Sequence, residues 1–134
     1  MPLGTHITLD CISCKLDNLF KNIHSLELFI STFEKEIKNA NLTVVGKASH
    51  YFSKDAITLT FILKESHINI HTWPELSYVS ADIYVCNYSQ NNILAAEKIA
   101  EAIESIFLPE QINKQYISRT HQCNDGNTNS RQKN

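Results

Sequence analysis

The sequence predicts an α+β protein built as a two-layer sandwich, in which an antiparallel sheet carries two main helices on one face. Two segments with helical spacing of apolar residues and about six strand-like runs favour this fold. The order is loosely pseudo-repeated, because strand, helix and strands are followed by strands, helix and strand. A length of 134 residues allows one core, so we expect a single domain over residues 1–121.

The first predicted elements are a strand and a helix. Residues 6–11 alternate between polar and apolar side chains, which is typical of a half-buried strand. Ser25 is a plausible N-cap, and after it apolar residues recur with helical spacing at Leu26, Phe29, Ile30, Phe33 and Ile37. We expect this helix to end near residues 39–41 and Gly46 to mark a turn.

The rest of the chain predicts strands, a second helix and a tail. The strand-like runs are residues 47–52, which are the weakest, 57–63, 66–72 and 81–86. Asn91-Asn92 then caps a helix that Pro109 stops, with an apolar stripe at Ile93, Ala96, Ala100, Ile103 and Phe107. Residues 116–117 indicate a last short strand. Residues 122–134 have no large apolar residue except Cys123, so we expect a disordered polar tail.

Composition excludes several classes of function. The formal charge of −2 leaves no basic excess for tracking nucleic-acid phosphates, so we expect no nucleic-acid partner. No apolar run approaches the roughly 20 residues of a membrane span, and no secretory signal is visible, so we expect a cytoplasmic protein without a membrane partner. The cysteines are expected to be free thiols; Cys11 and Cys14 have CxxC spacing but lack the second ligand pair of a zinc site.

Residues 64–75 contain the densest group of side chains that could take part in catalysis. His67 and His71 would chelate a metal on a helix, but on a strand they lie roughly 13 Å apart, so we predict no metal site. Ser66 or Cys86 with His71 suggests a nucleophile and its base, although no Gly-x-Ser-x-Gly turn surrounds Ser66. The alternative is that these are ordinary polar side chains on the exposed face of a sheet.

The motif ESHxxIHTWPE over residues 65–75, followed by DIYxC over residues 82–86, resembles the signature of the prokaryotic S-adenosylmethionine decarboxylase proenzymes. The segment LGxH at residues 3–6 and Cys14 are also similar, and the resemblance covers residues 3–121. The motif is long and ungapped, so chance agreement does not explain it.

The resemblance implies a lyase that is made as a zymogen and processes itself. Ser66 would attack the carbonyl of Glu65, His71 would remove the Cα proton of Ser66, and Thr58 would assist. The chain would be cut autocatalytically into a beta chain, residues 1–65, and an alpha chain, residues 66–134. Ser66 would become a covalent pyruvoyl cofactor. The residue types suit this task, since they include a hydroxyl nucleophile and an imidazole.

The resemblance also implies a substrate and an assembly. The pyruvoyl group would form a Schiff base with S-adenosylmethionine, and Cys86 would return a proton after CO₂ leaves, which supplies the aminopropyl donor for spermidine in polyamine biosynthesis. Phe52, Trp73 and Glu75 match positions that contact the substrate, although core packing is an alternative for the two aromatic residues. Family members assemble as dimers of cleaved protomers. Two other hypotheses stay open: the same chemistry acting on arginine or ornithine, and a binding homologue that never cleaves.

Two features complicate this interpretation. Ser66 and His71 are five residues apart, so a regular strand puts them on opposite faces, and we expect a strained bend or bulge near Glu65-Ser66 that lets His71 reach Ser66. The chain also departs from the family pattern. Val85 and Asn87 flank Cys86 where Thr and Gly are frequent.

Overall fold

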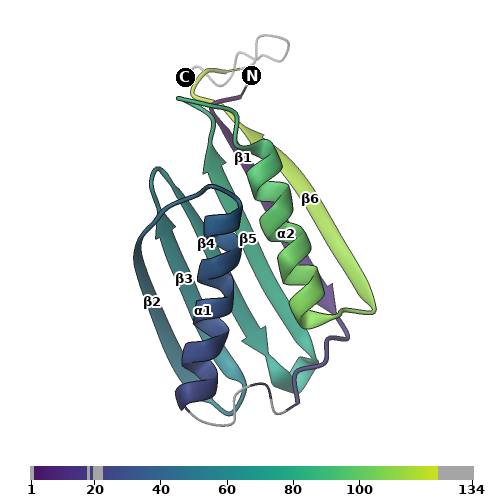
Figure 1. The fold of residues 1–134 in the computed structure, drawn as a ribbon. Helices are drawn as coiled ribbons and strands as arrows, with labels where there is room; N and C mark the ends of the chain where they lie inside the picture. Colours follow the sequence, from purple (N-terminus) through teal and green to yellow (C-terminus); the bar gives the residue numbers. More distant parts are fainter. Residues whose placement is uncertain (1, 18, 20–22, 124–134) are drawn as a thin grey trace.

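A six-stranded antiparallel sheet forms one layer of the protein and two helices form the other (Figure 1). The computed structural model describes residues 2–17, 19 and 23–123. The strands are β1 (Gly4–Ile12), β2 (Val44–Ser53), β3 (Ala56–Leu63), β4 (Ser66–Trp73), β5 (Tyr78–Cys86) and β6 (Gln111–Arg119). They are arranged in the order β2-β3-β4-β5-β1-β6. The predicted α+β sandwich is confirmed.

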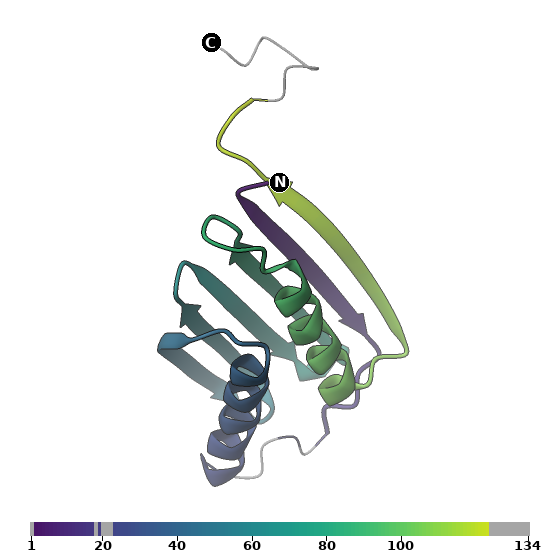
Figure 2. The ribbon, with the colours of Figure 1, turned by 45° about the horizontal axis from the view of Figure 1, so that its top comes forward.

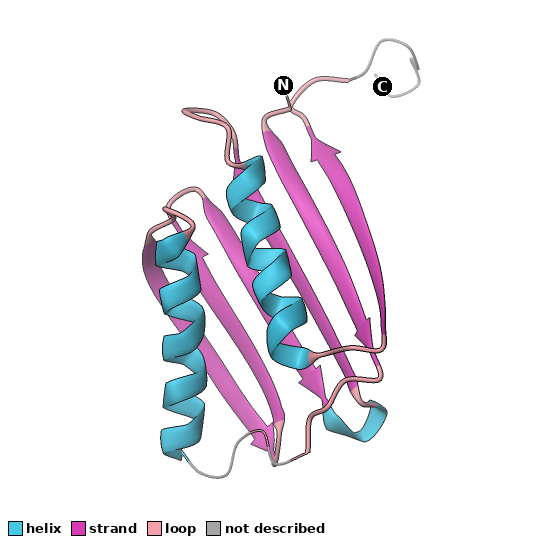
Figure 3. Ribbon diagram, turned by 45° about the vertical axis from the view of Figure 1, so that its right-hand side comes forward, coloured by secondary structure: helices cyan, strands magenta, loops and turns pink. Residues whose placement is uncertain are grey.

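Both helices lie on the same face of the sheet, as Figure 3 shows. Helix α1 (Ile23–Asn39) covers the half formed by β2, β3 and β4, and α2 (Ile93–Phe107) covers β5 and β1. The opposite face of the sheet carries no element of the described chain. No helix among the described residues combines the length and apolar character needed to span a bilayer.

The core fills the space between the sheet and the helices. Alternate residues of the central strands point into it, as the strict alternation of buried and half-buried positions along β5 shows. Helix residues at spacings of three and four complete it. The largest fully buried side chains are Phe33, Phe61, Phe107, Ile7, Leu9, Ile37, Ile57, Leu59, Ile68, Ile70 and Ile83. The half-buried polar residues of these strands, such as Asn69, His71 and Asp82, therefore face the open side of the sheet.

The two ends of the sheet carry different loops. We call the end with the β3–β4 turn and the loop of residues 87–92 the upper end, as it is oriented in Figure 1. The start of β1 and the end of β6 also meet there, where Gly4 pairs with Arg119 (Figure 2). The lower end carries the β2–β3 turn and the short 3₁₀ helix η1 (Pro74–Leu76).

Several sequence-based boundaries were wrong. Helix α1 begins at Ile23, before the predicted cap at Ser25. Gly46 lies inside β2, at a register shift against β3, and edge strands accommodate such irregularities. Strand β6 spans nine residues rather than two, because its pairing with β1 stabilises a segment with little apolar pattern of its own. Most of the predicted tail, residues 124–134, lies outside the described residues.

Candidate active site

The predicted cleavage bond lies in the tight turn between β3 and β4. Leu63 pairs with Ser66, so Lys64 and Glu65 form a two-residue turn. Glu65 has φ 66°, in the left-handed region, which costs a residue with a side chain roughly 1–2 kcal/mol. The peptide bond between Glu65 and Ser66 thus follows a strained, exposed residue.

Ser66 and Cys86 meet at the upper end of the sheet. The backbone N–H of Cys86 donates a hydrogen bond of 3.2 Å to the Ser66 Oγ. Cys86 is the last residue of β5 and is half-buried, and its Sγ accepts a hydrogen bond of 3.4 Å from the N–H of Tyr88. A donor aimed at Oγ stabilises negative charge that develops on that oxygen. The predicted nucleophile and the predicted proton donor are therefore neighbours.

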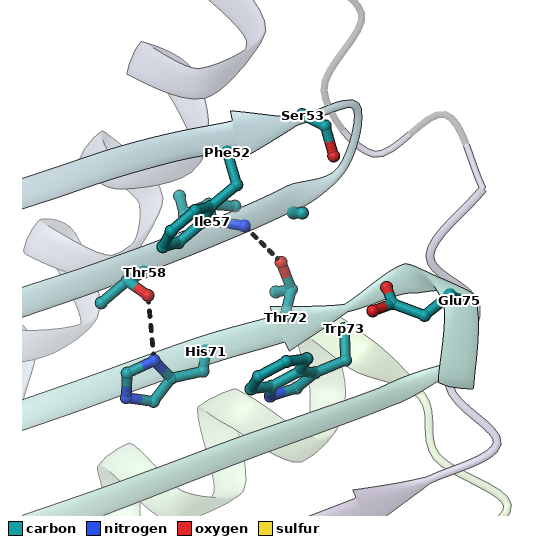
Figure 4. Close-up of a pocket in the computed structure, with 9 residues that line it drawn as sticks. Phe52, Ser53, Ile57, Thr58, His71, Thr72, Trp73 and Glu75 are labelled. Atoms are coloured by element: carbon teal, nitrogen blue, oxygen red, sulfur yellow. Dashed lines mark hydrogen bonds between the residues drawn. The ribbon is translucent and has the colours of Figure 1, made fainter.

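His71 and Thr58 form a second cluster, on the open face of the sheet. They are direct cross-strand partners on β4 and β3. Thr58 Oγ1 and His71 Nδ1 lie 3.0 Å apart in a hydrogen bond, which Figure 4 shows. This bond occupies one ring nitrogen of His71 and leaves Nε2 for other chemistry.

A cavity of about 510 Å³ opens beside this second cluster, within the size range of small-molecule sites. Phe52 and Trp73 are 64% and 44% exposed, so the alternative of core packing is wrong for both. In Figure 4 the Phe52 ring is drawn next to Thr58 and the Trp73 ring next to His71, with Glu75 beyond Trp73. The lining residues are Phe52, Ser53, Ala56, Ile57, Thr58, His71, Thr72, Trp73 and Glu75.

Thr72 fixes the floor of this cavity. Its Oγ1 donates to the carbonyl of Asp55 at 2.6 Å and accepts from the N–H of Ile57 at 2.9 Å. Asp55 is a turn residue with φ 64°, so the buried hydroxyl ties the β2–β3 turn to β4. The positions of Phe52 and Trp73 relative to each other depend on this connection.

The two clusters are separate within the chain. Ser66 begins β4 and His71 is its sixth residue, roughly 16 Å further along the strand. The expected bend that would bring His71 to Ser66 is absent, because β4 pairs continuously with β3 from Ser66 to His71. Only the strained residue, Glu65, is found where the bend was predicted.

Comparison with known proteins identifies the family. The family model described as S-adenosylmethionine decarboxylase matches residues 5–120. The S-adenosylmethionine decarboxylase proenzyme of Sulfurihydrogenibium sp. is 33% identical over 110 residues, which cover 82% of this chain and 80% of that protein. The proenzyme of Thermodesulfovibrio yellowstonii is 30% identical over 102 residues, 76% of this chain and 73% of that protein. The chain belongs to the S-adenosylmethionine decarboxylase family.

A solved structure of this family agrees with the fold. The crystal structure of the adenosylmethionine decarboxylase from Aquifex aeolicus VF5 matches with a TM-score of 0.74 and 27% sequence identity. The match covers 92% of this chain and 98% of that one. The residues matched by the family model, 5–120, include every site residue predicted from the motif.

Sequence reasoning missed one cluster on the open face of this family member. Asp82 Oδ2 lies 2.9 Å from His6 Nε2 and 3.1 Å from His67 Nε2, and Asn69 Nδ2 also donates to this carboxylate. His67 and His71 do not share a site, as predicted for a strand. No short motif could reveal the cluster, since β1, β4 and β5 bring together residues far apart in the sequence.

The side chains of His6, His67 and Asp82 are close enough to hold a metal ion, but their surroundings favour a hydrogen-bonded network. Arg119 Nη1 lies 3.0 Å from His6 Nδ1. Since a guanidinium only donates, Nδ1 is the acceptor and the proton of a neutral His6 is on Nε2, facing Asp82. A metal at Nε2 would require the other tautomer beside a fixed cation.

Proposed function

We propose that this chain is a self-processing, pyruvoyl-dependent S-adenosylmethionine decarboxylase that supplies the aminopropyl donor for spermidine. The observation that carries the proposal is the contact of the Ser66 hydroxyl with the Cys86 N–H, directly after the strained residue Glu65. The four free cysteines favour action in the reducing cytoplasm.

The processing reaction uses groups of the chain itself. Ser66 Oγ attacks the carbonyl carbon of Glu65, and the peptide bond becomes an ester as the nitrogen of Ser66 takes up a proton. Loss of the Cα proton then breaks the Cβ–Oγ bond, which frees Glu65 as a carboxylate and leaves dehydroalanine. Water replaces its nitrogen, releasing ammonia and leaving a pyruvoyl group on His67. Relief of strain at Glu65 favours the first step.

His71 supplies the base in this proposal. If the Thr58 hydroxyl accepts the Nδ1 proton of His71, the lone pair on Nε2 is free to remove the Cα proton. Thr58 thereby assists processing by fixing the tautomer of the base. Within one chain, however, His71 stands too far from Ser66 to act on it.

The separation of the two clusters supports a dimer. The open face of the sheet is polar and carries no element of the described chain, and a two-fold pair would place the same patches on both copies. In that assembly, Ser66 and Cys86 of one copy meet His71 and Thr58 of the other. The cavity beside His71 then joins the same composite site.

The residues fit the pyruvoyl group and its substrate. Once formed, the ketone acts as an electron sink when CO₂ leaves an amino-acid substrate. Cys86 would return a proton to the substrate; its contact with Ser66 supports this role, and its Sγ accepts a hydrogen bond from the N–H of Tyr88. Phe52 and Trp73 offer aromatic faces to an adenine and a sulfonium, and Glu75 offers a carboxylate to ribose hydroxyls.

Intact mass measurement tests the proposal. Purified chain incubated at neutral pH should give fragments of residues 1–65 and 66–134, the second blocked to Edman sequencing, and the Ser66→Ala variant should stay whole. Cleaved protein should release CO₂ from S-adenosylmethionine. A wild-type chain that remains uncut would instead support the hypothesis of a non-cleaving binding homologue.

A further inference from the structure

Cys86 is held at three points. Its N–H donates to Ser66 Oγ at 3.2 Å, its carbonyl accepts from Asn92 Nδ2 at 2.9 Å, and its Sγ accepts from the N–H of Tyr88 at 3.4 Å. The last two contacts come from the loop of residues 87–92. The position of the thiol therefore depends on the conformation of this loop.

Asn87 organises the loop from inside. It is only 6% exposed. Its Oδ1 accepts from the N–H of Asn92 at 2.9 Å, and its Nδ2 donates to Thr5 Oγ1 at 3.1 Å and to the carbonyl of Pro2 at 3.4 Å. Its own N–H donates to the carbonyl of Leu3 at 2.6 Å.

These partners fix the orientation of the Asn87 amide. The N–H of Asn92 can only donate and the carbonyl of Pro2 can only accept, so Oδ1 and Nδ2 cannot be exchanged. The side chain thus bridges the start of β1 and the end of the loop. A glycine, the frequent residue at this position in the family that the motif resembles, keeps the backbone bond to Leu3 but offers none of the three side-chain bonds.

We propose that Asn87 is a positioning residue that aims the Cys86 thiol at the substrate carbon. The proposal rests on the proposed function and deepens it, because it names what sets the accuracy of proton return. Asn87 acts through two routes: it is the chain neighbour of Cys86, and it holds Asn92, whose amide binds the Cys86 carbonyl. The hydrogen bonds of Asn87 go to Pro2, Leu3, Thr5 and Asn92, and none goes to Ser66.

The consequence is chemical and measurable. When the proton reaches the substrate α-carbon, water releases the decarboxylated amine and restores the ketone. When the proton reaches the carbon derived from Ser66 instead, water releases the substrate as an aldehyde, and its nitrogen stays behind as an N-terminal alanine. That chain end is inactive and, unlike the pyruvoyl end, open to Edman sequencing. The fraction of chains with this N-terminal alanine therefore reports which of the two carbons receives the proton.

The test compares Asn87→Gly and Asn87→Asp with the wild type and with Ser89→Ala, an exposed control in the same loop. After equal numbers of turnovers, Asn87→Gly should show about tenfold more N-terminal alanine and a lower kcat, with KM within about twofold, because a small misplacement of a reacting group is costly. Asn87→Asp keeps the acceptor for Asn92 but loses the donors, so its alanine fraction and its kcat should lie between those of the wild type and those of Asn87→Gly. Ser89→Ala should match the wild type.

The outcomes separate this proposal from the proposed function. A lower Tm for Asn87→Gly with an unchanged alanine fraction would show a merely structural role and overturn the positioning proposal alone. The same holds if Asn87→Asp, the less disruptive variant, equals the wild type in alanine fraction and kcat. A wild-type chain without cleavage or CO₂ release would overturn both proposals.

Discussion

Ser66 is the first residue of β4 and His71 is the sixth, so five residues of extended strand, roughly 16 Å, separate them. No rotamer change closes a gap of roughly 16 Å, and the pairing of β4 with both neighbours prevents a local bend. A reaction that needs both residues therefore requires a second copy of the chain.

Mixed dimers test this requirement. Neither Ser66→Ala nor His71→Ala should cleave alone. In a mixed dimer, the intact Ser66 of one chain meets the intact His71 of the other, so with equal random mixing about half of the His71→Ala chains should be cut. Tags of different mass on the two chains identify the fragments.

The control is a mixture of two preparations of Ser66→Ala, which should give no fragment. If the mixture of Ser66→Ala and His71→Ala also stays uncut although native mass spectrometry detects mixed dimers, the two residues do not meet across the interface.

In the proposed mechanism, His71 acts during processing and Cys86 acts later, during turnover. His71→Ala should stop at the ester, because the Cα proton of Ser66 is not removed, and hydroxylamine should then cut the chain by attacking the ester. Cys86→Ala should still cleave but lose turnover, because its proton serves the substrate. Gel analysis with and without hydroxylamine checks both. Complete loss of cleavage in Cys86→Ala would contradict this division of roles.

The sequence predicted the sheet better than the site. Alternation along residues 57–63 and 66–72 predicted the bounds of β3 and β4 accurately, since buried central strands carry a strong periodic pattern. The edge strand β6 has no such pattern and depends on its long-range pairing with β1. Likewise, the motif predicted Ser66 and His71 as site residues, but their separation and the cluster around Asp82 follow from strand register, which the sequence does not display.

Thiol reactivity should divide the cysteines into two groups. Burial raises the pKa of Cys11 to about 12, and burial also raises the pKa of Cys14. Both thiols stay protonated near pH 8 and should resist iodoacetamide, whereas the exposed Cys123 and the half-buried Cys86 should react. Peptide mapping of the native and the urea-unfolded chain provides the measurement.

Cys123→Ser is the matched control, because it removes the exposed thiol without touching the core. In this variant, loss of CO₂ release should follow alkylation of Cys86. Modification of native Cys11 as fast as Cys123 would contradict the packing of β1 against the helices.

Stability at high pH should report the bond between Tyr78 and Asp10. The Tyr78 hydroxyl donates to Asp10 Oδ1 at 2.5 Å, and this hydrogen bond raises the pKa of Tyr78 to about 12 from 10.0. Below pH 10 the phenol is protonated in both folded and unfolded chains, and the contribution is complete. As pH rises toward 12, only the unfolded chain loses its proton, so stability falls.

The stability difference between wild type and Tyr78→Phe, measured by urea unfolding, should therefore shrink as pH rises through this range. Tyr116→Phe, on the exposed edge strand β6, serves as the control. A difference that stays constant to pH 12 would show that the hydrogen bond does not hold the Tyr78 proton.

Glu75 distinguishes the possible substrates. For S-adenosylmethionine, its carboxylate would bind ribose hydroxyls, and charged hydrogen bonds contribute about 1.5–3 kcal/mol. Glu75→Gln should then lower the use of this substrate on the order of tenfold or more. For arginine or ornithine no ribose exists, and Glu75 would pair with the distal cation of the substrate instead. CO₂ release from all three substrates, for wild type and Glu75→Gln, compares these cases.

Competition by methylthioadenosine completes the comparison, because this compound keeps the adenine and the ribose but lacks the amino acid. Strong competition, reduced in Glu75→Gln and in Phe52→Ala, is the expected result, since the exposed ring of Phe52 lines the same cavity as Glu75. Leu76→Ala, an exposed apolar neighbour on η1 outside the cavity lining, should leave competition unchanged. Absence of competition together with CO₂ release from arginine or ornithine alone would overturn the assignment of S-adenosylmethionine as the substrate. The proposed chemistry of Ser66, His71 and Cys86 would still hold.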